Sequence, residues 1–280
     1  MFRGAKGFDD GYYNWTLDFG VLFPSCTAQP TSATGMFENS KFVYVDLTGL
    51  DMSLCIDVSK LFKNANVYGA NITTADLNGF VNVSEMFLGC QHLDNNTMTL
   101  LSSATFAVAI NAASMFAGAD SLSHSLTLTS ATFANLTNAG FMFSASKFTT
   151  ISVPAATFAS VTNAQRMFYN CTSVETIDMT SATFGSVTDA SSIFLNCNAL
   201  VTLTVPSSAT WTTSISFAQS DDMSIATLTN LSRWCADMSG GSTKTLTLNP
   251  NAKSRFQLPA TIAQYTLASS TLSAKNWSIQ

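Results

Sequence analysis

The stretch Ser181-Ala-Thr-Phe-Gly-Ser-Val-Thr-Asp-Ala-Ser-Ser-Ile-Phe-Leu-Asn-Cys-Asn-Ala-Leu200 decides the fold of this 280-residue chain, because its pattern returns at nearly constant intervals. Its anchor is the pair Ile193-Phe194. Equivalent pairs stand at Met36-Phe37, Leu61-Phe62, Met86-Phe87, Met115-Phe116, Met142-Phe143 and Met167-Phe168. Successive pairs are 25, 25, 29, 27, 25 and 26 residues apart. A fixed period of this length indicates a repeat protein, in which each repeat is one structural unit.

An Asp or Asn stands four residues before each of six successive pairs. These residues are Asp57, Asn82, Asn111, Asn138, Asn163 and Asp189. We predict that they form a structural ladder, in which each side-chain oxygen caps one or two helical turns by accepting a backbone N–H. A ladder of metal or ligand sites is the alternative. Capping is favoured because chain bends need partners for their backbone donors.

An aromatic ring recurs nine residues before the later pairs, each time at the end of an Ala-Thr-Phe triplet. The rings are Phe106, Phe133, Phe158 and Phe184, and Ala209-Thr210-Trp211 continues the series. We expect these rings to be buried and stacked on one another through adjacent repeats.

Short alternating runs, such as Thr150 to Val153 and Leu203 to Val205, have the period of two that indicates a strand. No single repeat can bury its own apolar side, so neighbouring repeats must stack. The expected fold is therefore an α/β repeat solenoid: a right-handed, leucine-rich-repeat-like stack of about eight coils. One parallel sheet would form one side, with short helical turns opposite and a C-terminal cap.

The repeat resembles a known family in the segments Thr183 to Ala190 and Ile193 to Cys197, followed by Leu200. These segments are similar to the BspA-like leucine-rich repeats of bacterial surface proteins, in the variant that reads VTN-x-x-x-MF-x-x-C-x-x-L. Such repeats also occur in structural proteins of phages. The resemblance implies a solenoid that presents a surface to other molecules.

Three regions are predicted: an irregular N-terminal coil or cap over 1–35, the repeats over 36–218, and a capping block over 219–280. In the last, Asp221-Asp222 would cap a helix that ends before Gly240-Gly241, and Thr243 to Asn249 alternates as a strand. Thr271 to Ile279 is expected to give a final turn of helix and a closing strand. This block resembles the C-terminal block of tail-associated phage proteins. At the other end, Met1-Phe2 begins in mid-repeat, which would leave an apolar end of the stack open.

Composition excludes two classes of partner. Only 10% of residues are charged and the net charge is −5 with 12 Lys and Arg, so the basic surface that nucleic acid requires is missing. No apolar run reaches the roughly 18 residues of a membrane span, so no membrane insertion is expected. Met1 to Trp15 includes Asp9 and Asp10 and does not read as a signal peptide.

The outward side of the predicted sheet is the candidate binding face. Its residues are Thr97, Thr99, Ser125, Thr127, Thr150, Ser152, Thr176, Asp178, Thr202 and Thr204. A flat, weakly charged array of hydroxyls favours recognition of protein or glycan, although Thr also simply suits a solvated strand. Ice binding is a remote alternative, because Ser152 and Asp178 interrupt the Thr lattice.

The sequence offers few groups for catalysis or metal binding. His92 and His124 are the two histidines and share no repeat offset, and no phosphate loop, nucleophile elbow or zinc helix occurs. Asp221-Asp222 lacks the spacing of a calcium loop. Cys171 and Cys197 hold equivalent places in adjacent repeats, within disulfide reach, but buried free thiols are favoured. We expect no cofactor and no metal.

The expected function is therefore a non-enzymatic structural or adhesive protein. Display on a phage virion, as a fibre, tail or head-decoration protein, is favoured by the start at Met1 without a signal peptide. A bacterial cell-surface adhesin that binds host protein or glycan is the alternative. The expected partners are other structural proteins of the same particle or surface, a host-surface protein or glycan, or further copies of the chain.

Overall fold

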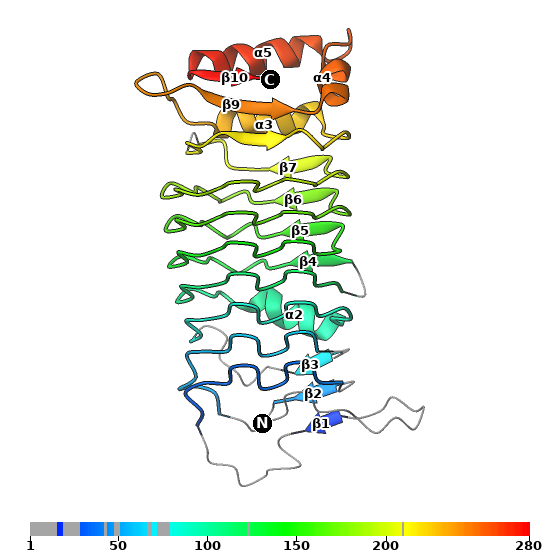
Figure 1. Ribbon diagram of the computed structural model, residues 1–280, viewed down its shortest axis with the longest axis vertical. Coiled ribbons are helices and arrows are strands. Elements are labelled where there is room, and N and C mark those ends of the chain that lie inside the picture. The colour runs from blue at the N-terminus through cyan, green and yellow to red at the C-terminus, as the bar shows by residue number, and fades with distance from the viewer. Residues whose placement is uncertain are drawn as a thin grey trace.

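The computed structural model describes residues 16–18, 29–41, 44–47, 51–65, 69–71, 79–121, 124–208 and 210–280. Successive repeats lie one above another along the long axis, with β1 at one end and helices α4 and α5 at the other (Figure 1). The protein therefore has an α/β repeat-like fold, built from parallel sheets and a few short helices. Met1-Phe2, expected to begin in mid-repeat, lies outside the described residues.

The strands are short, and the helices are few. The strands are β1 (Thr16–Asp18), β2 (Tyr44–Asp46), β3 (Gly69–Asn71), β4 (Ser125–Thr127), β5 (Thr150–Ser152), β6 (Thr176–Asp178), β7 (Thr202–Thr204), β8 (Ile215–Phe217), β9 (Lys244–Leu248) and β10 (Trp277–Ile279). The helices within the described residues are α2 (Asn95–Ser103), α3 (Ile225–Trp234), α4 (Pro250–Phe256) and α5 (Ile262–Ala274).

The expected single sheet is wrong: the described strands form three parallel sheets. Their orders are β1-β2-β3, β4-β5-β6-β7 and β10-β9-β8. Helix α2 separates the first sheet from the second because it takes the place of a strand in its repeat. In the middle sheet the central residues of the strands, Leu126, Ile151, Ile177 and Leu203, are in register and fully buried. Their neighbours point outward, as the period of two predicts.

The expected short helical turns opposite the sheet are also wrong. After each residue of the Asx ladder the chain makes a run of overlapping hydrogen-bonded turns, which we call a turn run. In the run after Asn163, Met167 N–H donates to Ala164 O, and Arg166 between them has φ +54°. A positive φ at this position is typical of a type II turn. Every second N–H of the run donates instead to the next repeat, as Phe168 does to Ile193 O at 2.9 Å. Pairing between repeats replaces the i→i−4 bonds of a helix.

Two aromatic ladders fill the core. The first joins the Phe of the anchor pairs and runs from Phe37 to Phe217, with ring centroids 5.0–5.9 Å apart. The second joins the triplet rings. Phe158 and Phe184 are fully buried with centroids 5.0 Å apart, so the stacking predicted for this pair is confirmed. Trp211 continues the series in an edge contact with Phe184.

From β8 onward the two sides of the stack change places: strands continue the side of the turn runs, and a helix continues the side of the strands. Phe217 of β8 stacks on Phe194, so a strand follows the turn runs. Helix α3 follows β7 on the strand side, and α5 packs on α3 and β10. The α3 N-cap is Ser224, whose side chain accepts the N–H of Thr227, and not the expected Asp221-Asp222. The ammonium of Lys275 donates to the carbonyls of Ser232 and Cys235, which satisfies acceptors at the end of α3.

Candidate functional site

The candidate binding face is formed by the outward side chains of β4 to β7. They make two rows in register along the stack: Ser125, Thr150, Thr176 and Thr202 in the first, and Thr127, Ser152, Asp178 and Thr204 in the second. Thr127 is exposed and the others are half-buried. Because all eight side chains are short and polar, the face is level and rich in hydroxyls.

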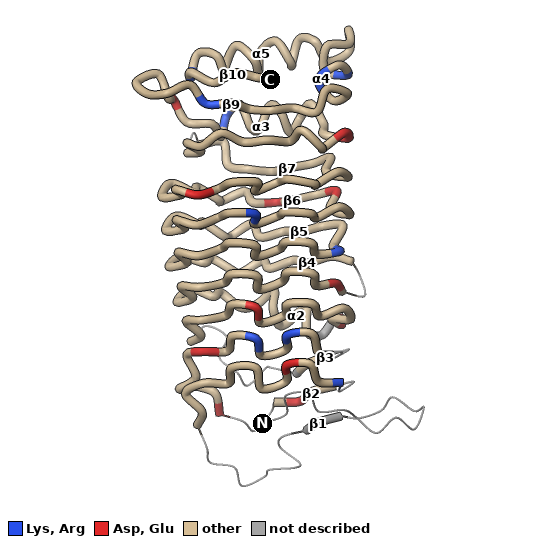
Figure 2. The backbone as a smooth tube through the Cα atoms, viewed as in Figure 1, with Lys and Arg blue, Asp and Glu red and all other residues tan. Residues whose placement is uncertain are grey.

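Asp178 contributes the carboxylate of this face. It accepts hydrogen bonds from the hydroxyls of Ser152, at 3.2 Å, and Thr180. Lysines, arginines and carboxylates are otherwise dispersed over the described stack, with no large area of one sign (Figure 2). The face therefore offers many hydrogen-bonding groups and little net charge (Figure 2).

Thr97 and Thr99 do not belong to this face. Both lie in helix α2, and Thr97 is fully buried. The Thr97 hydroxyl accepts the N–H of Ala70 in β3, at 2.9 Å, and donates to the Ala70 carbonyl, at 3.3 Å. Asp94 is the N-cap of α2, and its side chain accepts the N–H of Thr97. The alternation of Thr97 and Thr99 suggested a strand, whereas the Asp94 cap specifies a helix.

Side chains of the Asx ladder accept backbone N–H groups two residues ahead. Asn163 Oδ1 accepts from Gln165 at 2.9 Å, and Asp189 Oδ1 from Ser191 at 2.9 Å. Asn82, Asn111, Asn138 and Asp57 make the same bond. The bonds close Asx turns and not helix caps. Asn163 Nδ2 also donates to Asn138 Oδ1 at 3.1 Å, which ties adjacent repeats together.

The two aspartates of this ladder have lowered pKa values. The backbone and side-chain hydrogen bonds from Ser191 lower the pKa of Asp189. Burial alone would raise the pKa of Asp57. Hydrogen bonds from Ser59 and other neighbours outweigh this effect, so the pKa of Asp57 is lowered overall. Both carboxylates therefore stay ionised at neutral pH.

The cysteines of the repeats are free and buried. Cys171 Sγ donates to Phe143 O at 2.9 Å, and Cys197 Sγ donates to Phe168 O at 3.1 Å. Burial raises the pKa of Cys171 to about 11 and that of Cys90 to about 12. The arrangement is the predicted ladder of thiols, and each thiol fills space in the core.

A cluster of charged and polar side chains brings both histidines together. His92, His124, Asp120 and Lys147 line a cavity of about 320 Å³. His124 Nδ1 lies 2.9 Å from Asp120 Oδ1. This cluster could not be predicted from the sequence, because His92 and His124 occupy unrelated places in their repeats. Within the described part of the chain, no three His, Cys, Asp or Glu side chains could hold a metal ion.

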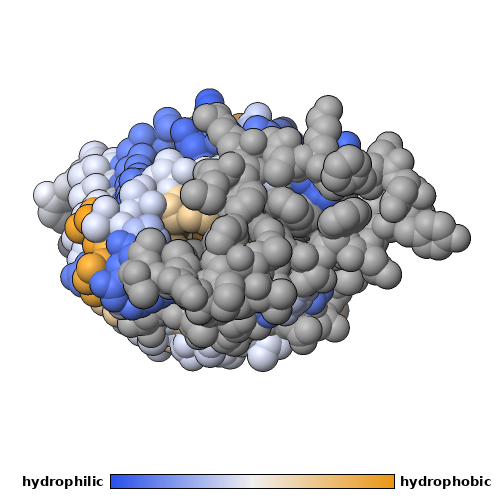
Figure 3. Space-filling model, turned by 90° about the horizontal axis from the view of Figure 1, so that it is seen from below, coloured by the Kyte–Doolittle hydropathy of each residue, from blue (hydrophilic) through white to orange (hydrophobic). Residues whose placement is uncertain are grey.

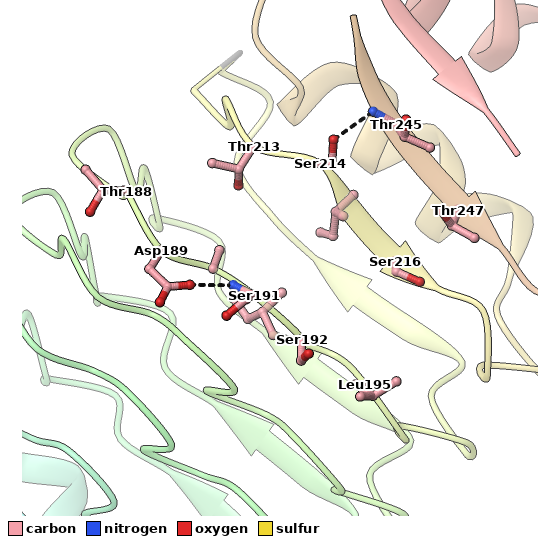
Figure 4. A pocket seen from close by; sticks show the side chains of 13 residues that line it. Thr188, Asp189, Ser191, Ser192, Leu195, Thr213, Ser214, Ser216, Thr245 and Thr247 are labelled. Carbon is pink, nitrogen blue, oxygen red and sulfur yellow. Dashed lines mark hydrogen bonds between the residues drawn. The ribbon is translucent and has the colours of Figure 1, made fainter.

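A larger groove of about 530 Å³ lies where the last turn run meets the C-terminal sheet (Figure 4). One side is the turn run from Thr188 to Leu195, and the other comprises Thr213 to Ser216 and residues of β9. Eight of its 13 lining residues are Ser or Thr, Asp189 adds a carboxylate, and the other four are apolar. The sequence did not reveal this groove, because it depends on how β8 meets the preceding repeat.

Comparison with known families matches the repeats and not the C-terminal block. Residues 31–156 and 110–206 match the family described as "Mycoplasma protein of unknown function, DUF285". The chain belongs to this family. Together the matches cover more than half of the chain, and DUF285 is associated with BspA-like repeat surface proteins. No curated protein and no solved structure matches the chain.

One end of the stack presents a mostly polar described surface (Figure 3). Seen from the N-terminal end, its coloured part is mostly hydrophilic, with a small hydrophobic group at one edge (Figure 3). In the segments that the structure describes, no helix combines the length and hydrophobicity needed to span a bilayer.

Proposed function

We propose that this protein is a non-enzymatic, surface-displayed repeat protein that contacts other molecules through the strand face of β4 to β7. The observation that carries the proposal is the register of that face. Eight short polar side chains lie level in two rows, while the apolar side chains between them are buried. A broad polar face of this kind suits many weak contacts at once.

The repeat architecture supports this function. We propose that the stack is a right-handed solenoid of the leucine-rich-repeat type, with the BspA-like repeat variant as its unit. In such a stack the period fixes the spacing of surface side chains at about 4.8 Å between strands. A partner with its own regular surface could then bind several repeats together, and copies on one particle would add avidity.

Two carriers of the protein are proposed. The family association favours the surface of a bacterial cell, where the protein would act as an adhesin toward host protein or glycan. The phage virion is the second carrier, and it rests on the resemblance of the C-terminal block to phage tail proteins. Genes for capsid and portal proteins beside this one would favour the virion, and genes for surface export would favour the cell.

The ice-binding alternative ranks last. Its lattice would need Thr in every position, but the second row reads Thr127, Ser152, Asp178 and Thr204. The hydrogen-bonded carboxylate of Asp178 breaks the uniform spacing of hydroxyl and methyl groups.

The proposal is tested by placing charge on the strand face. The double variant Thr150→Glu/Thr176→Glu puts two carboxylates on adjacent strands, and Ala159→Glu/Ser186→Glu puts two on exposed positions away from that face. Binding of the labelled protein to intact bacteria and to cultured animal cells would be measured, with self-association followed by light scattering. We expect the first variant to lose binding or assembly and the second to retain it.

Three outcomes would contradict the proposal. The first is equal binding by both variants, because contact would then lie elsewhere. The second is a strictly monomeric wild-type protein that binds no cell. The third is turnover of a small substrate by the purified chain.

A further inference from the structure

The hydrogen bonding between successive turn runs stops abruptly at the last one. A turn run also follows Ser32, which precedes the Asx ladder. From this run to the one after Asp189 there are six junctions between neighbouring runs, and each has four backbone hydrogen bonds. At the last of these junctions, Ala164, Arg166, Phe168 and Asn170 donate to Asp189, Ser191, Ile193 and Leu195. The regularity shows where every second N–H of a run points: toward the next repeat on the C-terminal side.

The next element on that side is β8, and it does not accept these donors. Among the described residues, the N–H groups of Ala190, Ser192 and Phe194 have no partner, and Asn196 N–H is taken by the Gln219 side chain at 2.9 Å. Strand β8 pairs only with β9, so its other edge faces the turn run unpaired. Two open edges therefore border the groove of about 530 Å³.

Polar groups on the β8 side are short of partners too. Thr210 and Thr213, in the segment leading to β8, have buried hydroxyls without a hydrogen bond. Only one other such hydroxyl, that of Ser40, occurs in the described part of the chain. Of these residues Thr213 lines the groove, so the β8 side of the junction leaves a polar group unpaired next to it.

The shape of the groove excludes an added strand. Phe194 and Phe217 stack with centroids 5.0 Å apart, which is the ordinary spacing of neighbouring repeats. A strand inserted between two edges would require about twice the 4.8 Å spacing of paired strands. The junction is therefore closed at this ring pair and admits only a compact ligand beside it. The volume lies within the range of about 300–1,000 Å³ that is typical of small-molecule sites.

The lining selects the chemistry of that ligand. It includes the hydroxyls of four serines and four threonines: Thr188, Ser191, Ser192, Thr213, Ser214, Ser216, Thr245 and Thr247. No lysine, arginine or histidine is among the lining residues, and Asp189 is anionic, so a carboxylate or phosphate would meet uncompensated repulsion. Hydroxyls both donate and accept, free N–H groups donate, and the carboxylate accepts.

We propose that this groove binds a neutral saccharide unit, whose ring hydroxyls pair with the free N–H groups of the last turn run and with the hydroxyls of β8 and β9. Ser191, Ser192, Ser214 and Ser216 lie around the gap between run and strand (Figure 4). The site is separate from the strand face of β4 to β7. Either can therefore fail experimentally without the other.

The first test concerns the open junction itself. Amide hydrogen exchange of the full chain should be fast at Ala190 and Ser192 and slow at Ala164 and Arg166, which hold the same positions in the preceding repeat and are hydrogen-bonded. Equal protection of the two pairs would mean that the junction is closed, and the proposal would be overturned.

The second test is binding. Glucose, galactose, mannose and N-acetylglucosamine would be titrated separately into the labelled protein by NMR, up to about 50 mM, which reveals millimolar dissociation constants. We expect at least one sugar to shift the amide signals of Ala190 and Ser192. Failure of all four sugars to shift these signals, or equally large shifts with acetate, would overturn the proposal.

Matched variants locate the binding. Ser216→Val/Thr247→Val removes two hydroxyls from the groove with a residue suited to strands, and Thr202→Val/Thr204→Val makes the same kind of change on the strand face. Sugar affinity should fall about tenfold in the first variant and stay within about twofold in the second. Unchanged affinity in the first variant, with its spectrum otherwise intact, would contradict a site in the groove.

Discussion

The hydroxyl of Thr227 in α3 accepts the N–H of Leu203 in β7 at 3.0 Å and donates to the carbonyl of Val201 at 2.9 Å. One side chain therefore takes the place of a strand at the edge of the middle sheet. Thr97 in α2 does the same for Ala70 in β3. In both helices the Thr is the third residue after the N-cap. A helix can thus follow a strand in this stack without leaving the buried edge unpaired.

Replacing Thr227 with Val should destabilise the protein by about 1–3 kcal/mol, because it leaves the buried N–H of Leu203 unpaired without changing side-chain volume. The Val201 carbonyl loses one bond but keeps the N–H of Ser224. The free energy of unfolding would be measured with denaturant. Thr229→Val is the matched control, because the Thr229 hydroxyl bonds to Ile225 O within the same helix. An equal loss in both variants would show that the edge contact has no special weight.

Replacing Phe184 with Ala should cost about 3–5 kcal/mol, because the ring is fully buried between Phe158 and Trp211 and its removal opens a cavity. Phe141→Ala provides the comparison. Its ring is half-buried and also sits at a positive φ, +59° against +48° for Phe184, so backbone strain is similar in the two variants. A loss as large at Phe141 as at Phe184 would mean that the ladder does not determine stability.

The sequence was sufficient to predict features at positions where every repeat carries the same type of residue. The interval of the Met-Phe pair, the buried rings and the strand register all follow from side-chain burial, which the period exposes directly. The turn runs could not be predicted in the same way. Asn163, Ala164, Met167 and Phe168 have helical spacing, and the alternative depends on hydrogen bonds to the next repeat. An indication was present, however: at the second left-handed position of each run stands Asn39, Asn64, Gly89, Gly118, Ala145, Asn170 or Asn196. Asn and Gly tolerate that conformation best.

The candidate sites could be predicted from the sequence less completely than the fold. Thr150, Thr176 and Thr202 were placed correctly because each begins a strand of the same register. Thr97 was misplaced because one N-cap residue, Asp94, outweighs a short alternation. The groove was beyond prediction, since it arises from hydrogen bonds that Ala190 and Ser192 do not make to β8.

Replacing Asn163 with Ala should lower stability by about 1 kcal/mol, because the variant loses the bond to Gln165 N–H and the bond to Asn138 Oδ1. Thermal and denaturant unfolding would measure the change. Asn163→Asp keeps the acceptor for Gln165 but cannot donate to Asn138, so its loss should be intermediate. If Asn163→Asp had the same free energy of unfolding as the original protein, the hydrogen bond between repeats would make no net contribution to stability.

Acid should weaken the Asx ladder through Asp57 and Asp189. Their pKa values are lowered in the folded protein. Each therefore contributes stability above the unfolded value of about 3.9, and the contribution disappears as the pH falls through the lower folded value. Asp57→Asn/Asp189→Asn keeps an Oδ1 acceptor for the N–H groups of Ser59 and Ser191 and removes the titration. Unfolding measured from pH 7 to about pH 3 should show a smaller acid loss in the variant. Parallel curves would refute the assignment.

The buried thiols should be unreactive in the folded protein. Thiolate is the reactive form. With the pKa of Cys171 raised to about 11 and that of Cys90 to about 12, only about one Cys171 in a thousand is ionised at pH 8. Cys26 lies outside the described residues, so the assay uses a Cys26→Ser background, in which a thiol reagent would be added with and without denaturant. We expect no fast reaction in the folded state and release of all five thiols on unfolding without reductant.

Release of only three would instead indicate a disulfide, for which Cys171 and Cys197 are the neighbouring pair. Fast reaction before unfolding would show that the thiol ladder opens to solvent, which the bonds from Cys171 to Phe143 and from Cys197 to Phe168 argue against.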